Sequence, residues 1–314
     1  MRLSSLGIPL LLSASALQAG DLDEVKAAGV LRHIGVPYAN FITGAGDGMD
    51  VEIMQRFAAS LGVKYEYVQA DWGTLFPDLT GRKVASHGNE IEDLGPSPVK
   101  ADVGANGITV LPWRTKVVDF SEPTFPTQVW LVARIDSPIK PITPSGNLDT
   151  DIAAVKQLMV GHSLFTKTKT CLDPALYKLS ALGVTGLEFK GTLNELAPAV
   201  INGEAELTLL DVPDTLVALK KWPGKIMIIG PVGPVQDMSV AFPKTSPKLL
   251  AAFNTFLQGL KADGTYHKLV EKYYPFAFGF FPDFFARQAA PAAAAATPAP
   301  AAVVPSPPAP APKL

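Results

Sequence analysis

The sequence predicts an α/β protein with two compact units. Short apolar strands alternate with amphipathic helices from residue 30 onward, and this order predicts parallel sheets built from βαβ units. A second series of the same kind follows a break in the pattern between Pro138 and Pro144. The length of 314 residues, 47% of them hydrophobic, is sufficient for two buried cores.

The first unit is expected to begin with a strand at residues 30–36 and a helix at 49–61. Apolar residues recur in the second segment at helical spacing, and Gly62 ends it. Residues 63–68 alternate as a strand does. The remaining predictions for this unit are a short helix at 72–79, a strand starting at 101, and a strand at 129–133.

The segment from Gly81 to Lys100 is polar and contains glycine and proline. It has no clear period, so we expect a surface loop there.

The second unit is expected to contain several short elements. The predicted helices lie at 152–158, 174–182, 193–201 and 215–221, and the predicted strands at 162–165, 187–189 and 205–210. After Pro234 the chain returns to an extended stretch at 238–242 and two amphipathic helices, 247–260 and 266–274. The chain is therefore expected to pass from a first lobe (21–135) to a second lobe (136–233) and back to the first (234–288).

The two ends of the chain differ from the rest. Residues 1–20 combine Arg2, a short apolar stretch and small residues up to Ala19, which is typical of a cleaved export signal. Residues 289–314 are almost wholly alanine and proline, so a disordered tail without a core is expected. The aromatic cluster at 276–285 leaves two alternatives, packing onto the first lobe or a contact patch for a partner.

Composition excludes several classes of function. A net charge of −2 and a pI near 6.1 argue against a nucleic-acid surface. The single cysteine, Cys171, excludes an internal disulfide and a cysteine-based zinc cluster, and the four histidines are scattered. No metal and no cofactor are expected, a monomer is expected, and Cys171 is expected to be buried.

Two residues, Arg114 and Asp211, suit the two ends of an amino acid. A guanidinium is a planar fork of donors that matches a carboxylate. Asp211 follows an apolar run at the C-terminal end of a predicted strand, and α/β sheets bind ligands at that edge. A carboxylate there can hold an ammonium, so the pair predicts a clamp for a zwitterion.

Five landmarks resemble the family-3 extracellular solute-binding proteins, the periplasmic receptors that deliver polar amino acids to ABC importers. The resemblance covers roughly residues 28–275, and it rests on the order and spacing of the segments 48–52, 71–77, 107–121, 210–211 and 263–266. It implies a two-lobed periplasmic-binding-protein fold of type II with two hinge crossings. It also implies a periplasmic location and an ABC permease of the inner membrane as the partner.

The same resemblance assigns roles to individual residues. Arg114 matches the arginine that grips the ligand carboxylate, Thr109 matches a hydroxyl that joins the grip, and Gly107 matches a residue whose carbonyl faces the ligand amine. Asp211 matches the second-lobe aspartate that pairs with the ammonium.

Three aromatic residues fall where this family places walls around the ligand side chain. They are Tyr38, Phe41 and Trp72. For Tyr38 and Trp72 the alternative is ordinary core packing.

The chain departs from the family pattern in two places. Trp113 replaces the usual glutamate before the arginine. The second-lobe loop that normally caps the carboxylate is replaced by residues 165–171, where Thr168 and Thr170 precede a predicted helix start and are expected to meet an anion. The leading hypothesis is a non-enzymatic receptor. The alternatives are a dehydratase-type enzyme in the same cleft and a sensor or accessory binding module.

Overall fold

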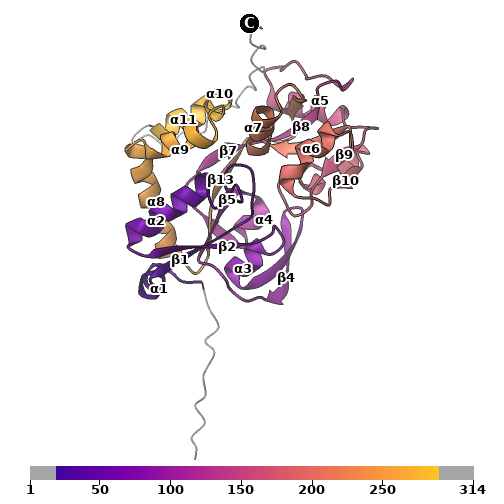
Figure 1. Ribbon diagram of the computed structural model, residues 1–314. Helices are drawn as coiled ribbons and strands as arrows, with labels where there is room; N and C mark the ends of the chain where they lie inside the picture. The colour runs from indigo at the N-terminus through magenta and orange to yellow at the C-terminus, as the bar shows by residue number, and fades with distance from the viewer. Residues whose placement is uncertain (1–18, 290–314) are drawn as a thin grey trace, which may run out of the picture.

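The computed structural model describes residues 19–289, which form two α/β lobes that each surround one sheet (Figure 1). The two-lobed α/β prediction is confirmed. The predicted export signal and the Ala/Pro tail lie outside the described residues, apart from residues 19, 20 and 289. Within the described range, no helix has the length and apolar character needed to cross a membrane.

The sheet of the first lobe has the strand order β2-β1-β5-β13-β6, and β7 also pairs with β13. Strands β1, β2 and β5 run parallel, as predicted from the βαβ order, whereas β13 returns antiparallel to β5. The strands are β1 (Val30–Gly35), β2 (Lys64–Gln69), β5 (Val103–Thr109), β6 (Val118–Phe120), β7 (Phe125–Thr127) and β13 (Gln236–Pro243). The helices are α1 (Leu22–Ala28), α2 (Met49–Leu61), α3 (Leu75–Thr80), α4 (Pro112–Thr115), α8 (Pro247–Ala262), α9 (Thr265–Tyr273), α10 (Ala277–Phe280) and α11 (Pro282–Ala289).

The sheet of the second lobe has the order β10-β9-β11-β8-β12. Its strands are β8 (Val129–Arg134), β9 (Leu164–Thr166), β10 (Gly186–Glu188), β11 (Leu207–Asp211) and β12 (Ile226–Pro231). Its helices are α5 (Leu148–Gln157), α6 (Leu196–Ile201), α7 (Val212–Lys221) and the 3₁₀ turns η1 (Pro174–Tyr177), η2 (Leu179–Leu182) and η3 (Leu193–Glu195). The helix expected at 174–182 is therefore two 3₁₀ turns, because Lys178 between them adopts a left-handed φ of 55°.

The first crossing between the lobes comes earlier than the expected boundary at residue 135. Strand β8 pairs with β11 and β12 of the second sheet, so the chain leaves the first sheet after Thr127. The second crossing follows β12, close to the expected position. Hydrogen bonds join the two crossings, because the Gln128 Nε2 atom donates to the Gly233 carbonyl at 2.8 Å and the Val232 amide donates to Val129 at 2.8 Å.

The segment expected to be a loop at 81–100 is a β-hairpin instead. Strands β3 (Arg82–His87) and β4 (Glu90–Pro96) pair antiparallel around the two-residue turn Gly88-Asn89, and Gly88 has a φ of 63°. A Gly-Asn pair is itself a signal for such a turn. The prediction was wrong because exposed polar side chains along both strands hide the apolar alternation on which it relied.

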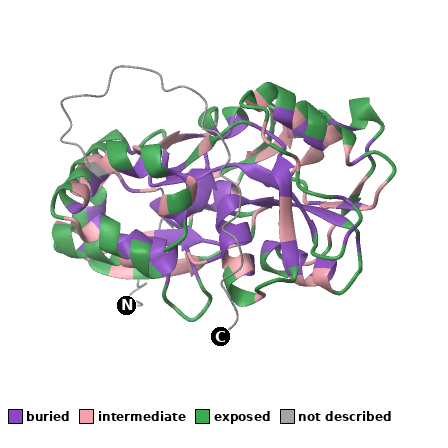
Figure 2. Cartoon of the chain, turned by 90° about the horizontal axis from the view of Figure 1, so that it is seen from above, coloured by how far each residue is buried: buried purple, intermediate pink, exposed green. Residues whose placement is uncertain are grey.

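The C-terminal aromatic cluster packs onto the protein, in agreement with the first of its two alternatives. Phe281, Phe284 and Phe285 are buried, and the Phe285 ring lies 6.1 Å from that of Phe125 in β7. The Phe280 ring lies 5.4 Å from Trp130 in β8, so the segment touches both sheets. Figure 2 shows the buried residues gathered along the two sheets and in the region where the lobes meet.

Candidate functional site

The guanidinium of Arg114 is held between aromatic rings at the end of β5. Pro112 starts the short helix α4, which turns Arg114 back over the sheet, and the side chain is only 1% exposed. Its Cζ atom lies 5.5 Å from the ring centre of Trp72, 5.4 Å from that of Phe76 and 5.3 Å from that of Trp113. Such contacts favour a cation and limit how the side chain moves.

The guanidinium is incompletely hydrogen-bonded. Its Nη1 atom donates to the Thr109 carbonyl at 2.9 Å, but the buried Nε and Nη2 atoms have no partner. Burial lowers the pKa of Arg114 to about 10, and the group stays charged at neutral pH. Two free donors on one buried cation fit the two oxygens of a carboxylate.

Asp211 approaches Arg114 from the other lobe. It ends β11 and caps α7, and its Oδ1 atom accepts from the Asp214 amide at 3.3 Å. Its Oδ2 atom accepts from the Cys171 thiol at 3.3 Å. Burial raises the pKa of Asp211, and neighbouring donors and Arg114 partly offset this. The structure thus brings the two residues singled out in the sequence into one buried cluster.

Tyr38 and Trp72 form the aromatic side of this cluster. Their ring centres lie 5.8 Å apart in an edge-on arrangement. Burial, followed by the nearby acids Asp211 and Asp214, raises the pKa of Tyr38 far above its usual value. Its buried hydroxyl has no hydrogen bond of regular geometry among the described residues. The Tyr38 hydroxyl therefore lies close to both acids and lowers their pKa values against the effect of burial.

Phe41 lies beneath the site, where its ring stacks on that of Tyr38 at 6.1 Å. Its ring packs on Phe125 and Tyr274 at 5.4 and 5.0 Å and is fully buried. Gly107 passes directly over this ring, since a Cβ atom at Gly107 would lie 2.3 Å from Phe41. The aromatic wall expected at Phe41 is thus a core contact that supports Gly107.

Asp50 fixes Gly107 from the first turn of α2. Its Oδ2 atom accepts from the Gly107 amide at 2.7 Å, while Oδ1 has no partner. Burial raises the pKa of this carboxyl to about 7, against the effect of the Gly107 hydrogen bond.

This pKa predicts a pH dependence of stability. Between about pH 4 and 7 the folded state keeps a proton that the unfolded chain has released, so the contribution of Asp50 to stability falls as the pH rises and is constant above that range. We expect the melting temperature of the wild type, relative to that of Asp50→Asn, to decrease from pH 5 to 7.5. Calorimetry at several pH values measures it, and a difference that does not change with pH would contradict the assignment.

The structure does not bring Thr168 and Thr170 to the cluster as free anion ligands. Thr168 is exposed, and both its amide and its hydroxyl bond Glu188. Thr170 is buried, but its hydroxyl donates to the Lys167 carbonyl and accepts from the Leu172 amide. These threonines shape the loop at 165–171, and local hydrogen bonds use the groups that were expected to face a ligand.

The same loop contributes a residue that the sequence analysis did not place in the site. Cys171 meets Asp211, and its thiol also faces Thr109 of the first lobe. Tyr177 donates to the Cys171 carbonyl at 2.6 Å and lies near Arg114. No local pattern distinguishes these residues, because Cys171 meets Asp211 from a distant part of the sequence and the contacts with Thr109 and Arg114 cross between the lobes.

Two further polar side chains at the sheet edge are buried and without partners. Asn106 precedes Gly107 in β5, and neither its nitrogen nor its oxygen is hydrogen-bonded. Thr127 ends β7, next to Gln128, whose carbonyl accepts from the Val212 amide, and its hydroxyl is also free. Buried polar groups are normally paired, so unpaired ones call for an explanation.

Known proteins resemble this chain in sequence and in fold. Residues 97–276 match the family model described as bacterial extracellular solute-binding proteins, family 3. Curated relatives include the membrane-bound lytic murein transglycosylase F of Desulfosudis oleivorans (24% identical, 72% of this chain and 44% of the relative) and that of Pseudomonas putida strain GB-1 (25%, 85% and 51%). The chain spans about half the length of these relatives.

Solved structures with two lobes resemble the chain over most of its length. Holo ArgBP from T. maritima is 25% identical, with a TM-score of 0.60, over 80% of this chain and 99% of that one. The ancestral amino-acid-binding protein AncCDT-1, a precursor of cyclohexadienyl dehydratase, is 23% identical with a TM-score of 0.62 (81% and 98%). A substrate-binding protein of an ABC uptake transporter from Streptococcus pneumoniae, solved with bound histidine, is 15% identical with a TM-score of 0.63 (81% and 95%).

Proposed function

The chain belongs to the bacterial extracellular solute-binding proteins of family 3, and on that premise we propose that it is a periplasmic receptor for an amino acid. The ligand binds as a zwitterion between the lobes, with its carboxylate at Arg114 and its ammonium at Asp211. The closed receptor then delivers it to an ABC permease in the inner membrane.

The observation that carries this proposal is the set of buried polar atoms without partners. Arg114 has two such atoms, and Tyr38 has one. Each unsatisfied buried group costs about 1–3 kcal/mol, more when it is charged, so closing the lobes over an empty site is unfavourable. A zwitterion supplies acceptors to Arg114 and donors to Asp211. Because it touches both lobes, it shifts the hinge equilibrium toward the closed form.

The ammonium half of the clamp is tested by Asp211→Asn. An amide keeps the shape of the side chain but removes the charge that pairs with the ammonium. We expect binding of the cognate amino acid to weaken by about 2–4 kcal/mol, while binding of its deaminated analogue changes less. Titration calorimetry with both compounds gives the two affinities. Equal losses for both compounds would argue against an ammonium at Asp211.

The function as a whole is tested by screening amino acids and small carboxylates for a rise in melting temperature. A ligand that binds only the native state raises it by mass action. Small-angle scattering with and without the best ligand then measures lobe closure. A protein that binds an amino acid without becoming more compact would contradict the hinged receptor.

A binding module that reports its ligand to a partner is a second candidate. It is favoured by the curated relatives, which are murein transglycosylases matched over 72–85% of this chain. The two candidates predict different partners for the ligand-loaded protein, a permease or a cell-wall enzyme. Crosslinking in whole cells with and without the ligand separates them.

A further inference from the structure

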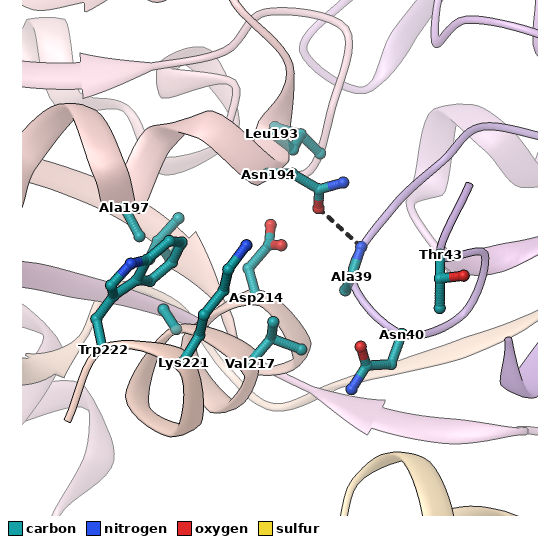
Figure 3. A pocket seen from close by; sticks show the side chains of 12 residues that line it. Ala39, Asn40, Thr43, Leu193, Asn194, Ala197, Asp214, Val217, Lys221 and Trp222 are labelled. Carbon is teal, nitrogen blue, oxygen red and sulfur yellow. Dashed lines mark hydrogen bonds between the residues drawn. The ribbon is translucent and has the colours of Figure 1, made fainter. Parts of the chain in front are cut away.

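A second pocket lies between the lobes, away from the aromatic rings around Arg114. It has a volume of about 260 Å³. The turn at residues 39–43 of the first lobe forms one wall, and η3, α6 and α7 of the second lobe form the other (Figure 3). The Ala39 amide donates to the Asn194 Oδ1 atom at 2.8 Å across this boundary. The pocket therefore depends on the two lobes being together.

The inner part of the pocket carries a carboxylate without a full set of partners. Asp214, in the first turn of α7, is 7% exposed, and its buried Oδ2 atom has no hydrogen bond of regular geometry, although the Tyr38 hydroxyl lies beside the carboxyl group. Burial and the neighbouring Asp211 raise the pKa of Asp214 far above its usual value. A cationic group on a ligand would complete the pairing of this side chain and allow it to ionise.

The outer part carries the opposite charge. Lys221 lies two turns later on the same face of α7, about 10 Å along the helix axis. It is exposed, and its Nζ atom lies 4.8 Å from the ring centre of Trp222. The lining also includes the apolar side chains of Val217, Ala218 and Ala197. The pocket thus combines a buried acid, an exposed base and apolar side chains.

We propose that this pocket is a second binding site, next to the clamp at Arg114 and Asp211 but lined by other side chains, for a small molecule with an ammonium at one end and a carboxylate at the other. Asp214 takes the ammonium, Lys221 takes the carboxylate, and the apolar wall contacts the chain between them. The rise of about 10 Å along α7 between the positions of Asp214 and Lys221 favours an ω-amino acid over an α-amino acid, whose charged groups share one carbon. Because both lobes line the pocket, its occupant favours the closed form.

The test uses three probes of equal chain length, 5-aminopentanoate, pentylamine and pentanoate, in titration calorimetry with the full protein. We expect the wild type to bind 5-aminopentanoate at least about tenfold more tightly than either monofunctional probe, as the loss of one charge-assisted contact predicts. Lys221→Met is expected to bind 5-aminopentanoate no better than pentylamine. Asp214→Asn is expected to lose most of its affinity for both amines. Val217→Phe fills the pocket and is expected to lose affinity for both amines as well.

Arg114→Lys separates this site from the clamp. It is expected to bind 5-aminopentanoate as the wild type does, although its binding of an α-amino acid is impaired. No saturable binding of 5-aminopentanoate to the wild type would overturn the second site and leave the proposed receptor function intact. An affinity unchanged in both Asp214→Asn and Val217→Phe would overturn it too, as would loss of 5-aminopentanoate binding in Arg114→Lys.

Discussion

Arg114→Lys is expected to weaken binding of the cognate amino acid by about 2–5 kcal/mol, which is a loss of roughly thirtyfold to several thousandfold. A lysine ammonium cannot present two parallel donors to a carboxylate. It also cannot reproduce the planar contact with three rings, whose centres lie 5.3–5.5 Å from the Arg114 Cζ atom. Titration calorimetry on the purified variant measures the loss.

Arg134→Lys is the matched control for this experiment. Arg134 is exposed and pairs with Asp136 at 2.5 Å on the surface of the second lobe. The same chemical change there is expected to leave affinity unaltered, since exposed ion pairs contribute little. Unchanged affinity in Arg114→Lys, with a melting temperature like that of the wild type, would remove Arg114 from the site.

Gly107→Ala is expected to destabilise the fold by about 2–5 kcal/mol. Gly107 has a φ of 63°, which costs a residue with a Cβ atom about 1–2 kcal/mol. The new methyl group would also lie 2.3 Å from the buried ring of Phe41, and overpacking of a core typically costs about 1–3 kcal/mol more. Calorimetric melting of the ligand-free protein measures the loss.

Gly88→Ala separates these two costs. Gly88 has the same φ of 63°, but nothing lies within 4 Å of the position of its Cβ atom. Gly88→Ala is expected to lose only about 1–2 kcal/mol of folding free energy, which is the cost of the positive φ. Adding Phe41→Leu to Gly107→Ala should recover part of the stability, because the smaller side chain leaves room for the methyl group. Equal effects of the two glycine variants would show that Phe41 does not restrict Gly107.

Much of the fold follows from local sequence patterns. The helix predicted at 49–61 is α2 with the same bounds, because its apolar stripe and Gly62 are both local signals. Strands β6, β7 and β12 were missed, although the equally short β9 and β10 were predicted. The hairpin at 82–96 was missed because apolar periodicity was given more weight than its Gly-Asn turn.

The site was less predictable than the fold. Asp211 stands out because it ends an apolar strand, and Arg114 because its guanidinium lies in a segment that resembles the family pattern. The roles of Asn106, Thr127 and Asp214 depend on which buried atoms lack partners, and that is a property of the folded, closed protein. Thr168 lies in a loop that was expected to meet an anion, but its hydroxyl donates to Glu188 instead.

The joined crossings determine how the lobes are able to move. The Gln128 side chain bonds Gly233 on the other crossing and also accepts from the Trp130 indole at 2.8 Å, which fixes its orientation. Two neighbouring attachment points suppress twisting and sliding and leave mainly one rotational degree of freedom. The lobes then open and close mainly by rotation about one hinge axis. A ligand that binds anywhere in the cleft restricts only this hinge rotation. The conformational entropy that the lobes lose on closure is therefore small and depends little on the position of the ligand.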